Sequence, residues 1–158
     1  MHKILSTPEF DAEMPINDNG ASSLIVATRH SDKQMMTLLL NMRASVQSAD
    51  FKGLTALHHA CQEGFSDKVE LLLSACSGEL IEDLFQMKTK NLEATPFHLA
   101  VISGSRSTVA RMIRYASLDK YLERTKKGET VFDLASDRFE IRKMLTDAFA
   151  YLSSKERR

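Results

Sequence analysis

A short segment recurs four times along this chain of 158 residues and restricts its possible folds more than any other feature. Each copy has a hydroxyl residue followed by an apolar stretch, and the hydroxyl residues are Ser22, Thr55, Thr95 and Thr130. They are 33, 40 and 35 residues apart, so a base period of 33 residues carries insertions. A fixed period of this size indicates stacked supersecondary units. We therefore predict a repeat solenoid.

Each unit has the pattern of two short helices. A Ser or Thr before an apolar stretch can cap a helix by accepting a backbone N–H, and Pro96 suits the first helical position. The second helices are expected to begin at caps in Ser31-Asp32, Ser66-Asp67 and Ser105. Their predicted apolar faces are Met35, Leu38 and Leu39; Val69, Leu72 and Leu73; and Val109, Met112 and Ile113. A pair of this size cannot bury both faces alone, so neighbouring units should stack.

The four segments resemble the ankyrin-repeat family, whose 33-residue unit carries Thr-Pro-Leu-His-x-Ala. Residues 94–100, Ala-Thr-Pro-Phe-His-Leu-Ala, match best, and Gly64-Phe65 and Gly104-Ser105 fall where the family turns between its two helices. The resemblance covers residues 17–150 and implies an all-α solenoid with hairpin-like finger loops. The implied division is an N-terminal extension or cap (1–16), repeats at 17–49, 50–89, 90–124 and 125–150, and a C-terminal tail (151–158).

Two insertions and three substitutions depart from the family pattern. Arg43, Cys76 and Ala116 stand where the family usually has a left-handed glycine. The chain is then longer than the base period by 7 residues after Cys76 and by 2 after Ala116. The apolar residues there have helical spacing, so both insertions are predicted as extra helical turns: Leu80, Ile81, Leu84 and Phe85, then Leu118, Tyr121 and Leu122. Rebuilt turns would remove the need for glycine at Cys76 and Ala116, but not at Arg43.

The overall charge and composition exclude several functional classes. Lys plus Arg and Asp plus Glu are both 21, and this balance argues against nucleic-acid binding. No apolar segment approaches membrane-spanning length. Two cysteines without a secretory leader are expected to be reduced thiols, which predicts an intracellular protein, cytoplasmic and/or nuclear, or one in a host cytosol if it is a microbial secreted effector. On its own the chain is expected to be monomeric.

One cluster of residues could supply metal ligands: His58, His59 and Cys61. Zinc requires three or four ligands, and no second pair with a matching spacing follows. The resemblance instead implies that His58 and His98 are structural histidines that tie adjacent units through backbone hydrogen bonds. Nucleotide-binding and esterase motifs are absent. The prediction is therefore a non-enzyme without a cofactor, and a metal-dependent enzyme using this cluster is the remote alternative. Met35, Met36 and Met42 are interpreted as core residues.

The resemblance also implies where a partner would bind, because ankyrin proteins usually meet partners at the finger tips and first helices. The positions carried over are Phe51, Lys52, Leu54, Gln62, Glu63, Asn91, Leu92, Ala94, Ile102, Ser103, Lys126, Lys127 and Glu129. Phe51, Leu54, Leu92 and Ile102 are apolar, and in a stack they would share one concave face. An apolar patch with a polar rim is typical of a protein-binding surface. The alternative is that residues 77–90 fold over Leu92 and bury it.

These observations predict a non-catalytic module that binds another protein through its concave, finger-bearing face. The alternative within the same fold is a small stand-alone inhibitor or regulator of a kinase or transcription factor. Cyclin-dependent kinase inhibitors of similar length have this fold, but length and fold are the only features shared. Fold alone does not define function.

Overall fold

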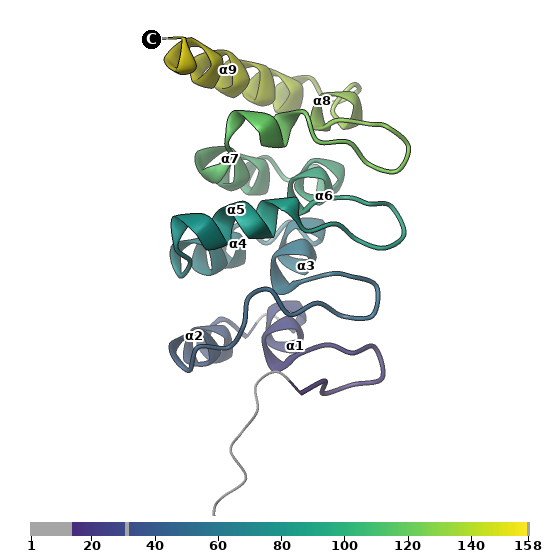
Figure 1. Ribbon diagram of the computed structural model, residues 1–158, viewed down its shortest axis with the longest axis vertical. Helices are drawn as coiled ribbons and strands as arrows, with labels where there is room; N and C mark the ends of the chain where they lie inside the picture. The colour runs from purple at the N-terminus through teal and green to yellow at the C-terminus, as the bar shows by residue number, and fades with distance from the viewer. Residues whose placement is uncertain (1–13, 31, 158) are drawn as a thin grey trace, which may run out of the picture.

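The computed structural model describes residues 14–30 and 32–157 and consists mostly of helices (Figure 1). In chain order they are α1 (Ser23–Arg29), α2 (Lys33–Asn41), α3 (Ala56–Gln62), α4 (Ser66–Ser74), α5 (Gly78–Gln86), α6 (Pro96–Ser103), α7 (Arg106–Tyr115), the 3-10 helix η1 (Leu118–Tyr121), α8 (Val131–Leu134) and α9 (Phe139–Glu156). Strand-like pairing in the described residues is limited to one bridge, between Ala49 and Thr55. The predicted all-α class is confirmed. Most of the expected N-terminal extension, residues 1–13, lies outside the described residues.

The helices form pairs that stack along one axis, and the loops between pairs project to one side (Figure 1). Helix α3 packs between α1 and α6, while α4 packs against α7. The stack buries a continuous core that includes Leu57, Leu72, Phe97 and Met112, each no more than 1% exposed. We call the pairs α1–α2, α3–α4, α6–α7 and α8–α9 the first to fourth units. Stacking shields apolar faces that a single pair would leave in water.

Hydroxyl caps begin the first helix of every unit, as predicted. Each accepts a hydrogen bond from the backbone N–H three residues further on: Ser22, Thr55, Thr95 and Thr130. In the last three units a side chain also bonds back to the cap's own N–H: His58, His98 and Asp133. Pro96 occupies the first turn of α6, where its missing N–H costs no helical bond. These helix starts are fixed by residues within one turn.

His58 and His98 tie adjacent units together, as the family resemblance implied. The Nδ1 atom of His58 accepts from the backbone N–H of Thr55 at 3.2 Å. The proton of the neutral ring therefore lies on Nε2, which donates to the Met87 carbonyl at 3.1 Å. His98 repeats the arrangement, with its Nε2 donating to the Glu123 carbonyl at 3.0 Å. Each histidine joins a first helix to the loop that leads into the next unit.

Both insertions form helical turns that pack on the stack, as predicted. The first contains α5, in which Leu84 and Phe85 are buried. The second contains η1, where Tyr121 is buried. The Phe97 ring meets both insertions edge-on, at centroid distances of 6.1 Å from Phe85 and 5.2 Å from Tyr121. The insertions therefore supply part of the core.

The predicted apolar face of α2 is confirmed at Leu39 but was wrong at Met35 and Leu38. Met36 and Leu39 are buried, whereas Met35 is 44% exposed and Leu38 is 52% exposed. The core interpretation also fails for Met42, which is 52% exposed. Consecutive apolar residues allow either of two helix faces to point inward, so periodicity alone could not choose between them. The faces predicted for α4 and α7 do contain buried residues, including Val69, Leu72, Val109 and Met112.

The turns between helices show where a left-handed backbone is required. Gly64 (φ 73°) and Gly104 (φ 76°) supply it between the two helices of the second and third units. Arg43 adopts φ 61° itself, at a cost of roughly 1–2 kcal/mol, whereas Ala116 has φ −77° because the turn before η1 is rebuilt.

The expected caps of the second helices are only partly correct. Asp32 caps α2 by accepting from Met35, and Ser105 caps α7 by accepting from Thr108. The expected cap of α4 was wrong, because α4 begins at Ser66 itself and Phe65 precedes it without a side-chain cap. Ser31 lies outside the described residues.

The fourth unit is built from helices of unequal length. Helix α8 has four residues and α9 has 18. Residues 151–156, expected as a tail, continue α9. Arg138, just before α9, donates to the carbonyl oxygens of Val101 and Ile102 and so ties the fourth unit to the third.

Candidate protein-binding surface

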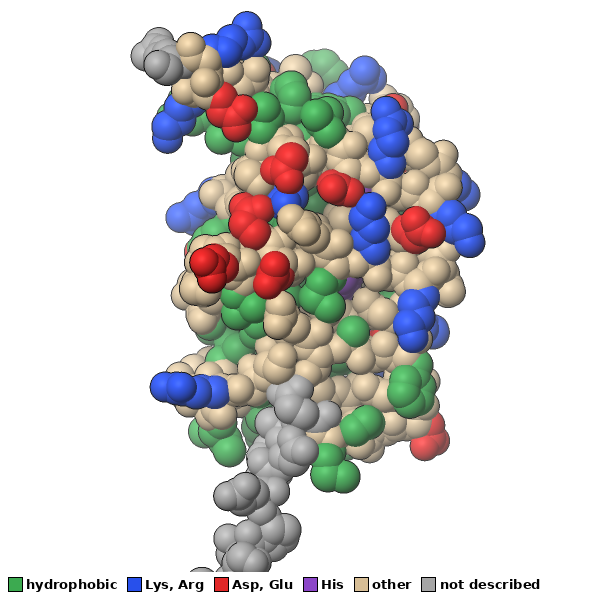
Figure 2. Space-filling model, viewed as in Figure 1, with side chains coloured by type: hydrophobic (Ala, Val, Ile, Leu, Met, Phe, Trp, Pro, Cys, Tyr) green, Lys and Arg blue, Asp and Glu red, His purple; other side chains and the backbone are tan. Residues whose placement is uncertain are grey.

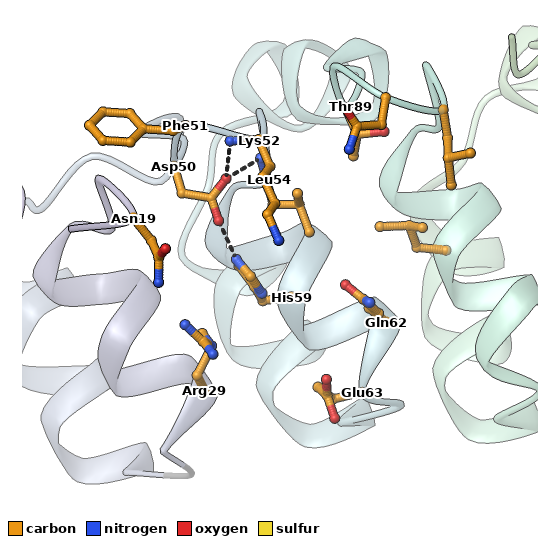
Figure 3. Close-up of a pocket in the computed structure, with 13 residues that line it drawn as sticks. Asn19, Arg29, Asp50, Phe51, Lys52, Leu54, His59, Gln62, Glu63 and Thr89 are labelled. Carbon is orange, nitrogen blue, oxygen red and sulfur yellow. Dashed lines mark hydrogen bonds and ion pairs between the residues drawn. The ribbon is translucent and has the colours of Figure 1, made fainter. Parts of the chain in front are cut away.

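Three finger loops connect consecutive units, at residues 49–55, 88–95 and 123–130, and the loop before α1 projects to the same side (Figure 1). In the first, one carboxylate oxygen of Asp50 accepts from the N–H groups of Lys52 and Leu54, both at 3.0 Å (Figure 3). The other carboxylate oxygen lies 2.9 Å from His59 Nε2 on α3. Burial raises the pKa of Asp50, but the bonds from Leu54, His59 and Lys52 outweigh it, and the pKa lies below its usual value. An ionised Asp50 therefore shapes this loop and fastens it to α3.

In the other two loops, threonine hydroxyls accept hydrogen bonds from backbone N–H groups of the same loop. Thr89 Oγ1 accepts from the Ala94 N–H at 3.2 Å, and Thr125 Oγ1 accepts from the Glu129 N–H at 3.3 Å. The second loop also has Glu93 at φ 49°, in a position where the first and third have glycine with φ 80°. The three loops thus have similar shapes but different side chains.

Backbone hydrogen bonds join each finger loop to the preceding loop. The N–H of Phe51 donates to the backbone carbonyl of Asn19 at 3.0 Å. The N–H of Lys90 donates to the carbonyl of Lys52 at 2.9 Å, and the N–H of Lys126 donates to the carbonyl of Leu92 at 2.8 Å. These bonds run along the stack between consecutive units. The backbones of the loop tips are consequently held in a row.

Two adjoining hollows lie beside this row, and we call them together the groove. The larger has a volume of about 390 Å³ and includes Phe51, Lys52, Leu54, Gln62, Glu63, Asn91 and Leu92 in its lining (Figure 3). The smaller, of about 220 Å³, includes Leu92, Ile102, Lys127 and Glu129. Leu92 lines both, so the groove runs from the first finger loop to the third.

The groove exposes three large apolar side chains. Phe51 is 64% exposed, Leu92 is 46% exposed and Ile102 is 41% exposed. Leu54 is half-buried. The inserted α5 does not bury Leu92, contrary to the alternative considered from the sequence. The Phe51 ring packs closely on Gly20, where an added Cβ would lie 2.6 Å from the ring.

The remaining expected site residues differ in their access to solvent. Lys52, Gln62, Glu63, Asn91, Lys126 and Lys127 are exposed, while Ser103 and Glu129 are half-buried. Ala94 is the exception, because it is fully buried, although it borders the smaller hollow. Its position beside a finger tip suggested exposure, but the backbone there turns inward and its N–H bonds to Thr89.

Sequence reasoning missed part of the groove wall. Asn19, Arg29, His59, Thr89 and Leu99 also line the larger hollow. Residues 17–20 precede their helix as the later finger loops precede theirs, so this position could have identified Asn19 as a candidate groove residue from the sequence. Arg29 lies at the far end of α1, and only the stacking of α1 beside α3 brings it to the groove.

The structure does not bring the candidate metal cluster together. His58 bonds to Thr55 and Met87, His59 pairs with Asp50, and the Cys61 thiol lies 3.6 Å from the Met112 sulfur. Within residues 14–30 and 32–157, no group of three or more His, Cys, Asp and Glu side chains has metal-binding geometry. Burial raises the pKa of Cys61, which disfavours the reactive thiolate.

The repeated helix pairs and finger loops define the class, and comparison with known proteins agrees. A model of ankyrin repeats in three copies matches residues 2–82, slightly more than half of the chain. The chain therefore belongs to the ankyrin-repeat family. That match includes residues 2–16, which the sequence analysis placed outside the repeats. Ankyrin repeats imply a protein-interaction module, and such domains are generally not catalytic.

A curated relative aligns with most of this chain. The tyrosine-protein kinase Shark of Drosophila melanogaster is 29% identical over 130 residues, which cover 81% of this chain. The chain spans only 12% of the length of that relative. None of the helices in the described residues is both long enough and apolar enough to cross a membrane.

Proposed function

We propose that this chain binds a partner protein in the groove, with Phe51, Leu92 and Ile102 as the apolar anchors. The observation that carries the proposal is the exposure of these three side chains along two adjoining hollows that share Leu92. Removing water-exposed apolar side chains from water by covering them with a partner lowers the free energy of the complex. The finger loops are already joined by hydrogen bonds, so less conformational freedom is lost on binding.

An inhibitor or regulator of a kinase or transcription factor is a particular case of this proposal. It would use the same groove, and the identity of the captured partner would distinguish it. We place the interaction inside the cell, cytoplasmic or nuclear, where the free thiols of Cys61 and Cys76 stay reduced. The protein without its partner is proposed to be a monomer.

Two phenylalanines provide a matched test. Phe51→Glu places a charge in the groove, whereas Phe139→Glu makes the same change at a side chain that is 78% exposed at the start of α9. An anchor contributes about 2 kcal/mol or more, so Phe51→Glu should weaken partner binding roughly 30-fold. Affinity capture with mass spectrometry, followed by titration of the purified partner, measures this effect.

The control variant Phe139→Glu should retain binding, and both variants should melt within a few degrees of the parent protein. Leu92→Asp tests a second anchor independently of the packing of Phe51 on Gly20. Partner binding that survives both Phe51→Glu and Leu92→Asp would falsify the groove proposal.

A further inference from the structure

Exposed charge is distributed unevenly over the molecule, although the chain has equal numbers of acidic and basic residues. Figure 2 shows acidic side chains gathered over the region of α5, and basic side chains along the edge formed by the finger loops as well as at the top and along the opposite edge of the molecule. Glu79 and Asp83 of α5 are exposed. The balanced total therefore does not mean that charge is spread evenly over the surface.

The basic edge contains a row of lysines beside the groove. Lys52, Lys90, Lys126 and Lys127 are exposed, and they come from three consecutive finger loops. Within the described residues no ion pair involves any of these four, whereas Lys88 pairs with Glu123 at 2.9 Å. Lys52 lines the larger hollow and Lys127 the smaller. Both hollows thus have an ammonium group available to a ligand.

Acidic groups near the groove compensate this charge only in part. Asp50 is buried and bonded to His59, and Glu129 is half-buried beside Thr125. Glu93 is exposed in the second finger loop, and Asp18 is exposed next to Asn19, which lines the larger hollow. Glu63 is exposed in the larger hollow, but Arg29 lines the same hollow. Exposed positive charge therefore predominates along the finger wall.

We infer that the partner segment bound in the groove is acidic and carries spaced apolar side chains. This inference rests on the proposed function and specifies the partner's chemistry. Apolar side chains of the segment cover Phe51, Leu92 and Ile102, while its carboxylates face Lys52, Lys90, Lys126 and Lys127. Complementary charge accelerates association and excludes basic competitors more than it adds affinity. A nucleic acid would satisfy the lysines but would leave the apolar hollows poorly filled.

Peptide display on the immobilised full chain tests the partner chemistry directly. We expect selected 12-residue peptides to be enriched in Asp and Glu together with Leu, Ile or Phe. Fluorescence anisotropy then measures their dissociation constants at about 50 and about 300 mM NaCl. Binding should weaken at the higher salt concentration, because the lysines are solvent-exposed and their interactions are screened.

Paired lysine variants supply the matched control. Lys52→Glu with Lys127→Glu reverses two charges at the groove, whereas Lys143→Glu with Lys155→Glu reverses two exposed charges on α9. The groove pair should weaken peptide binding roughly tenfold or more, and the α9 pair should leave it unchanged. Thermal melts verify that both double variants remain folded.

The outcomes separate this inference from the proposed function. One outcome would overturn only the acidic character of the partner. In it, the selected peptides bind Leu92→Asp more weakly than the parent, but they are not enriched in Asp or Glu and bind Lys52→Glu/Lys127→Glu as tightly as the parent. Selected peptides that bind Leu92→Asp as tightly as the parent would overturn the groove itself. A (dT)20 oligonucleotide that binds the parent as tightly as the peptides, and binds Lys52→Glu/Lys127→Glu more weakly, would replace the acidic segment with nucleic acid.

Discussion

At the scale of single residues, the buried histidines have a structural role with a chemical consequence. Burial lowers the pKa of His58 from 6.5 to about 4, and burial also lowers the pKa of His98. The hydrogen bonds explain why the neutral form is required. Protonation at Nδ1 would remove the acceptor that the Thr55 N–H uses. His58 is thus a neutral link between two units.

Acidification should therefore destabilise the protein before its carboxylates titrate. As pH falls below 6.5, the unfolded chain binds a proton at His58 that the folded chain does not bind until about pH 4. The free energy of unfolding consequently decreases through this window, by up to about 3 kcal/mol from His58. The lowered pKa of His98 acts in the same direction. Urea unfolding at pH 7 and pH 5 measures the decrease.

The histidine variants identify the source of this pH dependence. His58→Gln should reduce it, whereas His30→Gln, at an exposed position, should leave it unchanged. A free energy of unfolding that is the same at pH 7 and pH 5 in the parent protein would contradict the assignment.

At the scale of elements, α5 shows how an insertion becomes part of the core. Phe85 is 1% exposed and meets Phe97 of α6 edge-on. The Met87 carbonyl, one residue beyond the end of α5, accepts the His58 bond. The insertion therefore fills space between the second and third units and positions the loop leading to Leu92.

Truncation of Phe85 should accordingly be costly. Phe85→Ala is expected to lower the free energy of unfolding by about 3–5 kcal/mol, because it removes a buried ring and leaves a cavity. Phe139→Ala deletes the same atoms from a side chain that is 78% exposed and should change stability by no more than about 0.5 kcal/mol. Denaturant melts compare the two variants. Equal costs would mean that α5 does not pack on the stack as described.

At the scale of the whole molecule, stability and binding depend on the same stack. Each unit contacts mainly its neighbours, so stability is a sum of terms within units and between neighbouring units. The groove extends across several units, from Asn19 to Glu129. Loosening one interface should therefore disturb both the fold and the row of finger tips.

A leucine pair tests the register of the stack. Leu72 is 1% exposed in α4, where the helix packs on α7, while Leu38 is 52% exposed in α2. Leu72→Ala should cost about 2–5 kcal/mol, and Leu38→Ala should cost less than about 1 kcal/mol. Urea melts followed by circular dichroism give both values. The reverse order would show that the inward faces of these helices have been assigned incorrectly.

Features that depend on neighbours within a few residues were predictable from the sequence. Thr95, Pro96 and His98 lie within one helical turn, so their capping pattern is readable from their spacing. The period of the units and the helical character of both insertions followed from the same kind of local pattern. The exposure of Phe51 and Leu92 also agrees with expectation, because the family resemblance placed them at finger tips.

Long-range packing selects which of two adjacent residues points inward and which distant residues share a surface. Met35 and Met36 are both apolar, and tertiary packing, to which α1 contributes, places Met36 in the core and leaves Met35 44% exposed. Ala94 is buried by the fold of its finger loop, and Arg29 reaches the groove only because α1 stacks beside α3. Burial depends on contacts between residues far apart in the sequence, and local periodicity contains no information about those contacts.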